Sequence, residues 1–98
     1  MTFRKKLSSM PYAQAHVDIA PDGIWLVSYT TPVVYISNDG WLSCMGTYSN
    51  TTRRHIGAFM KEYVVLPNGS RGNYYMAKDC FMNNYEFNIN TGEVKDLP

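Results

Sequence analysis

A chain of 98 residues with a formal net charge of +1 is expected to form one domain, and it lacks the strongly basic balance of a dedicated nucleic-acid binder. Eight tyrosines and two tryptophans favour a surface that contacts other proteins, although several of the tyrosines are also expected to fill half-buried rows of a sheet. No apolar run approaches the ~18 residues of a membrane span, and the polar start lacks a signal-peptide core. Neither secretion nor membrane insertion is therefore expected.

Residues 1–14 carry no sustained hydrophobic period, and the sequence predicts a mobile or loosely docked N-terminal arm there, with a short helix as an alternative. Residues 15–98 are predicted to form the single folded domain. In it, β-forming segments at 16–19, 24–30, 33–36 and 41–45 are separated by turn residues, most clearly Asp39-Gly40. Pro32 cannot donate to a β-ladder, so a bend, a bulge or an edge position is expected at that point.

The strongest helical signal follows this meander. Apolar residues at i, i+3, i+4 and i+7 form one stripe, which consists of Ile56, Phe59, Met60 and Tyr63. A side chain among residues 49–51 is expected to cap the helix.

The rest of the chain predicts a loop at 67–73, a second helix whose stripe includes Tyr74, Ala77 and Phe81, and a hairpin formed by a strand at 85–89 and residues 94–97. The predicted fold is therefore an α+β domain in which an antiparallel β-meander is covered on one face by one or two helices and ends in a C-terminal β-hairpin.

Basic residues gather at the start of the first helix, where Arg53, Arg54 and His55 follow one another. Cations at this end oppose the helix macrodipole, which suggests either a bound anion or pairing with an acidic side chain. Salt bridges to Glu86, Glu93 or Asp96 are the alternative that the sequence leaves open.

For His55 alone, a partly buried structural role is expected before a role as base or ligand. The predicted partner-binding residues are Tyr48, Arg53, Arg54, His55, Arg71 and Tyr74.

The sequence shows no pattern for catalysis, a metal or a cofactor. His16, His55, Cys44 and Cys80 are not at ligand spacing, and no nucleophile motif surrounds a cysteine or histidine. We therefore expect a protein that is not an enzyme, with two reduced thiols, no metal and no cofactor.

Two segments carry a resemblance. Residues 28–36 (SYTTPVVYI) and residues 48–56 (YSNTTRRHI) with Phe59 resemble the pattern SYxTxVxxI … YSxTTxRHIxxF of a small domain family of unknown function. Pro32 departs from that pattern, where an ordinary apolar residue is usual. The resemblance implies an accessory protein of bacteriophages or mobile elements, located in the host bacterial cytoplasm.

The leading hypothesis is thus a non-catalytic protein that binds and modulates a host protein or ribonucleoprotein complex. One concrete form is an inhibitor of a host defence system such as CRISPR. The alternative is a small nucleic-acid-binding regulator that uses the basic helix start at Arg53 and Arg54. The sequence leaves the oligomeric state open.

Overall fold

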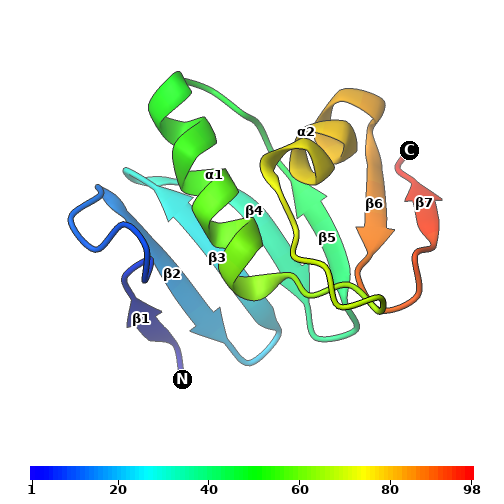
Figure 1. Ribbon diagram of the computed structural model, residues 1–98, viewed down its shortest axis with the longest axis horizontal. Coiled ribbons are helices and arrows are strands. Elements are labelled where there is room, and N and C mark those ends of the chain that lie inside the picture. The colour runs from blue at the N-terminus through cyan, green and yellow to red at the C-terminus, as the bar shows by residue number, and fades with distance from the viewer.

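Seven strands form one antiparallel sheet in which every strand pairs with its neighbours in sequence order. The computed structural model describes residues 1–98. In chain order the elements are β1 (Phe3–Lys5), β2 (Ala15–Ala20), β3 (Gly23–Ser28), β4 (Thr31–Ser37), β5 (Trp41–Cys44), α1 (Asn50–Tyr63), α2 (Tyr74–Asn83), β6 (Tyr85–Asn88) and β7 (Val94–Asp96). The predicted α+β fold and its C-terminal hairpin are confirmed (Figure 1).

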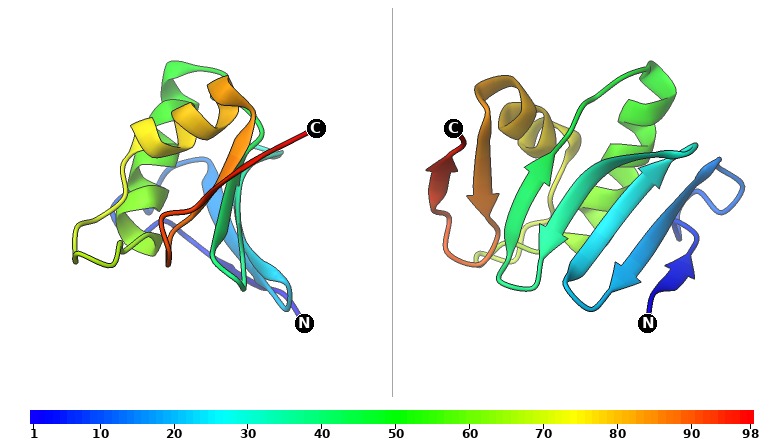
Figure 2. Two further views of the ribbon diagram at one scale, coloured as in Figure 1. Left: turned by 90° about the vertical axis from the view of Figure 1, so that its right-hand side faces the viewer. Right: turned by 180° about the vertical axis from the view of Figure 1, so that it is seen from behind.

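Both helices lie on the same face of the sheet, and the other face carries no covering element (Figure 2). The core lies between the two layers because successive strand residues point to opposite faces. In the middle of the sheet Val17, Leu26 and Val34 stand opposite one another across three strands, and all three are fully buried. Ile56 and Phe59 of α1 are buried as well, and they belong to the same hydrophobic core.

The interruption predicted at Pro32 is a β-bulge. The register between β3 and β4 shifts between Leu26 and Val27, so that Val27 pairs with Pro32. A bulge accommodates a residue that cannot donate to the ladder, and it lets β4 continue to Ser37.

The N-terminal segment is docked, which corrects the prediction of a mobile or loosely docked arm at residues 1–14. Phe3–Lys5 form edge strand β1, in which Arg4 stands opposite Asp18. Leu7 is 0% exposed, and both the backbone N–H and the hydroxyl of Ser8 donate to the Glu62 carboxylate at 2.9 Å. One buried leucine and two charge-assisted hydrogen bonds tie this segment to α1.

Both helices begin at capping side chains, and the cap of α1 lies within the expected range 49–51. The Ser49 hydroxyl accepts from the Thr52 N–H, and the Asn73 side chain accepts from the Met76 N–H. In α2 the buried stripe is narrower than predicted, because Phe81 is 42% exposed while Cys80 beside it is buried. The helix ends three residues later at Asn84, whose left-handed conformation turns the chain into β6.

Candidate binding surface

The outward face of α1 carries cations that have no acidic partner. Arg53, Arg54 and Lys61 are exposed, and no carboxylate oxygen lies within 4 Å of any of them. The first turn of α1 contains no acidic residue. Glu62, the only carboxylate of α1, accepts instead from Ser8.

The predicted alternative of internal salt bridges to Glu86, Glu93 or Asp96 is wrong. Glu86 pairs with Lys95 at 3.2 Å on the far strand pair, and neither Glu93 nor Asp96 lies within ion-pair distance of a cation. The charge of the two arginines therefore remains available at the surface.

A groove of about 420 Å³ runs over this face of α1. Four residues of α1 form its floor, namely Arg54, Gly57, Ala58 and Lys61. The walls are Ser9 and Met10 from the docked N-terminal segment and Asn73 and Tyr74 from the start of α2. In Figure 1 the helix lies between these two segments. We call this feature the α1 groove.

The predicted site residues are brought together only in part. Arg54 and Tyr74 both line the α1 groove, whereas Arg53, one residue earlier, is exposed outside it. Adjacent residues of a helix point in different directions, so Arg53 and Arg54 lie on different parts of the surface of α1. Tyr48 is 60% exposed just before the Ser49 cap, with a φ of 45° and its ring close to Gly46.

The structure contradicts the prediction that His55 contacts a partner, and it agrees with the structural role expected for that residue alone. His55 is 1% exposed, and its Nδ1 is hydrogen-bonded to the Ser28 hydroxyl at 2.9 Å. Burial lowers the pKa of the imidazole, because a charged ring would lose its hydration there.

The Ser28 hydroxyl also lies 3.1 Å from the Thr52 hydroxyl, which in turn is 3.2 Å from that of Ser49. This chain of hydrogen bonds fixes the first turn of α1 to the end of β3. We call Ser28, Ser49, Thr52 and His55 the cap network.

Arg71 lies apart from Arg53 and Arg54. It forms a β-bridge with Val65, immediately beyond the C-terminal end of α1. The arginine pair is near the opposite end of the helix, whose 14 residues span about 21 Å. The loop 64–73 folds back on itself through hydrogen bonds such as Gly72 N–H to Val64 C=O, which keeps Arg71 at that end.

The sequence reasoning missed the other groove residues, above all Gly57, Ala58 and Lys61. Their signal was present, since Arg54, Gly57, Ala58 and Lys61 follow i, i+3, i+4 and i+7 on the polar side of the helix. That spacing defines a second stripe opposite the buried one. Ser9 and Met10 could not be assigned, because their place depends on the docking of the N-terminal segment.

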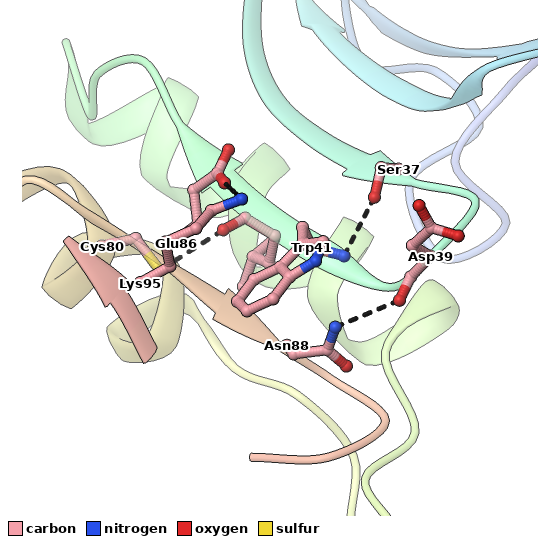
Figure 3. A network of polar contacts seen from close by, with 8 residues as sticks. Ser37, Asp39, Trp41, Cys80, Glu86, Asn88 and Lys95 are labelled. Carbon is pink, nitrogen blue, oxygen red and sulfur yellow. Dashed lines mark hydrogen bonds and ion pairs between the residues drawn. The ribbon is translucent and has the colours of Figure 1, made fainter. Parts of the chain in front are cut away.

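The uncovered sheet face is a second surface that the sequence reasoning did not single out. Trp25 and Tyr35 lie across neighbouring strands with ring centroids 4.2 Å apart. In Figure 3 the Trp41 ring lies beside the Lys95–Glu86 ion pair, and the Lys95 ammonium is 4.5 Å from the ring centroid.

The charged groups of this face already have partners within the molecule. Arg4 and His16 both contact the Asp18 carboxylate, and the hydrogen bond from the Arg4 guanidinium lowers the pKa of Asp18. The Tyr35 hydroxyl donates to Asp22. The α1 groove, by contrast, presents unpaired charge.

No group of three or more histidine, cysteine, aspartate or glutamate side chains is placed to hold a metal ion. Burial raises the pKa of Cys80 to about 12, and the pKa of Cys44 is raised for the same reason. Neither α1, with 14 residues, nor α2, with 10, has the length and hydrophobicity that a membrane-spanning helix needs.

These observations define a small α+β domain with a basic groove on its first helix. The chain belongs to a family of unknown function, DUF8033, whose family model matches residues 4–78. Neither the curated proteins nor the solved structures contain a significant match to the chain. The matched segment includes the whole α1 groove and ends within α2, before the terminal hairpin.

Proposed function

We propose that the protein is a small non-catalytic accessory protein of a phage or mobile element that binds and modulates a host protein in the bacterial cytoplasm. An inhibitor of a host defence system, of the anti-CRISPR kind, is one form of this activity. The phage and host context is carried by the resemblance of residues 28–36 and 48–59 described above. The binding surface is the outward face of α1.

The observation that supports this proposal best is the unpaired charge of Arg53 and Arg54. Cations near a helix start are disfavoured by a few tenths of a kcal/mol, and here no acidic side chain offsets that cost. Neither arginine contributes to the core or to an ion pair, so the fold does not explain them. A partner that supplies negative charge does explain them.

The buried hydroxyl and imidazole groups support a binding role over a catalytic one. Ser28 and His55 are close enough for proton transfer, but both are almost fully buried beneath the first turn of α1. A substrate could not reach either group without unfolding that turn. The same pair is fully explained as the anchor of the helix.

The experiment is affinity capture from a lysate of the host bacterium with the tagged protein, followed by mass spectrometry. Arg53→Glu with Arg54→Glu is expected to abolish capture of the partner while the circular dichroism spectrum stays unchanged. The matched control is Lys5→Glu with Lys6→Glu, which makes the same change in charge at exposed residues outside α1. Equal capture by wild type and the arginine variant would reject this surface.

A nucleic-acid-binding regulator is the second candidate, and the same unpaired arginines favour it. Two exposed aromatic residues could stack on bases, namely Tyr48, five residues before Arg53, and Tyr75, which packs against Tyr74 of the α1 groove. A gel-shift titration at two salt concentrations separates the candidates, because binding to phosphates weakens steeply with salt. The protein-binding proposal expects no specific shift at either concentration.

A further inference from the structure

We infer that the α1 groove receives one helix of the partner protein, lying along α1 with two acidic residues seven positions apart that face Arg54 and Lys61. This inference rests on the proposed function, since it names the chemistry of the partner for that surface. It is carried by the spacing of the groove residues, the low floor between them and the unpaired charge.

The spacing is that of helix-on-helix contacts. Arg54, Gly57, Ala58 and Lys61 occupy i, i+3, i+4 and i+7, so they form one stripe along the helix, with Gly57 and Ala58 on either side of the line from Arg54 to Lys61. The two cations are about 10.5 Å apart along the axis. Two residues seven positions apart on a partner helix have the same separation.

The surface of α1 between Arg54 and Lys61 is low enough for a partner helix to approach closely. Gly57 has no side chain, and a Cβ built there would meet only the Tyr74 Cβ at 3.9 Å. Ala58 adds a single methyl group. Helix axes pack 8–10 Å apart depending on the side chains at the contact, and small residues allow the shorter distances.

Charge complementarity selects an acidic occupant. No carboxylate lines the α1 groove, and its two charged side chains are both cationic. The hydrophobic residues of the lining are Met10, Ala58 and Tyr74. A helix with carboxylates at its ends and small apolar residues between them matches this arrangement.

A nucleic-acid strand fits the same groove less well. A strand carries one phosphate per ~3.4 Å of axis, so the phosphates between the two cations would lie over Gly57 and Ala58 without partners. Tyr74 is half-buried and holds an edge-to-face contact with Tyr75, which leaves it poorly placed to stack on a base.

The test is an NMR titration of ¹⁵N-labelled protein with synthetic peptides. The probe is a blocked Ala-rich peptide of about 20 residues, long enough to be helical, with two Glu residues seven positions apart. The comparison peptide has the same composition, with the two Glu residues about nine positions apart and hence on opposite faces. A short DNA duplex is the third probe.

The first peptide is expected to shift the amide signals of Arg54, Gly57, Ala58 and Lys61, and to bind about three-fold more tightly than the comparison peptide. The comparison peptide can place only one Glu on the groove, and the loss of one ion pair of the strength found at protein surfaces gives a difference of this size. Equal affinity of the two peptides, no shift with either, or tighter binding of the DNA duplex would each overturn the inference.

Two variants sharpen the result. Gly57→Gln fills the floor of the α1 groove without changing its charge, and it is expected to weaken binding of the first peptide at least as much as the change in Glu spacing does. Arg54→Glu with Lys61→Glu is expected to reverse the preference, so that a peptide with Lys at the two positions binds better. Lys5→Glu with Lys6→Glu is the control, and it should leave peptide binding nearly unchanged.

Failure of this inference and failure of the proposed function give different results. If the peptides do not bind selectively but lysate capture still depends on Arg53 and Arg54, the acidic-helix inference is wrong and the binding surface stands. If capture does not depend on the two arginines, the proposed surface itself is rejected.

Discussion

Ser28→Ala is expected to destabilise the protein far more than the loss of one small side chain suggests. The Ser28 hydroxyl is the centre of the cap network, with partners at 2.9 Å on His55 and 3.1 Å on Thr52. Its removal forfeits two buried hydrogen bonds, each worth about 1 kcal/mol, and leaves the His55 Nδ1 without a partner in the interior. Since Thr52 keeps its contact with Ser49, the desolvation penalty falls on His55 alone.

Together these terms predict a loss of about 3–4 kcal/mol in the free energy of unfolding. For a domain of this size the corresponding drop in melting temperature is about 12 °C or more. Chemical denaturation in urea, followed by circular dichroism, measures the effect. Ser43→Ala is the matched control, because Ser43 lies on β5 without a side-chain hydrogen bond and should change stability by less than about 0.5 kcal/mol.

A double-mutant cycle with His55→Leu tests whether the pair acts together. In the His55→Leu background Ser28→Ala is expected to cost about 2–3 kcal/mol less, because neither the Ser28–His55 hydrogen bond nor the orphaned nitrogen is present. A coupling energy indistinguishable from zero would refute the reasoning. The same conclusion would follow if Ser28→Ala and Ser43→Ala proved equally mild.

Three further predictions concern the same molecule. Ser49→Ala removes the hydroxyl that accepts from the Thr52 N–H, and it should cost about 1 kcal/mol in urea denaturation. Because burial lowers the pKa of His55, the imidazole binds a proton more readily in the unfolded chain than in the folded one. The free energy of unfolding should therefore fall as the pH drops below about 6.5. His55→Leu should flatten this pH dependence between about pH 5 and 7. With its pKa raised to about 12, the buried Cys80 should resist alkylation by iodoacetamide at pH 8 in the native protein and react in urea, as mass mapping would show.

Most of the fold could be predicted because local patterns and tertiary structure agree along the central part of the chain. The Asp39-Gly40 turn lies between the segments that form β4 and β5, and the apolar stripe of α1 is buried as expected, with Ile56, Phe59 and Met60 fully enclosed. In each case the residues that define the element also define its buried side. An irregularity at Pro32 was predictable for the same reason, because a residue without a backbone N–H interrupts the β-ladder at its own position.

The N-terminal segment could not be predicted, because its structure depends on residues far away in sequence. β1 has only three residues, all exposed, and its pairing is supplied by Val17, Asp18 and Ile19 of β2. Leu7 is a single apolar residue without a period, and Ser8 meets an acceptor 54 positions later. A short segment of this kind carries no signal that local reasoning can detect.

The candidate site was predicted in part for a related reason. Sequence identified the cations at the start of α1, but it could not show that His55 turns inward to Ser28 while Arg54 turns outward. It also grouped Arg71 with Arg53 and Arg54, although nearly the whole length of α1 separates them. The small residues Gly57 and Ala58 gain meaning only once the groove walls at Met10 and Tyr74 are in place.

The segment 48–63 therefore contains two kinds of residue that follow different physical requirements. Ser49, Thr52 and His55 are accounted for by the cap network, and the apolar stripe is accounted for by the core. Arg53 and Arg54 are accounted for by neither, and the fold would be as stable or slightly more stable without them, since they oppose the helix dipole. Charge reversal at Arg53 and Arg54 and truncation of Ser28 should consequently have different effects. The first should remove partner binding without lowering stability. The second should lower stability, while the protein that remains folded keeps the wild-type binding surface. If both variants changed stability and partner binding in the same way, Arg53 and Arg54 would contribute to the stability of the fold, and the proposal that this surface binds a partner would be rejected.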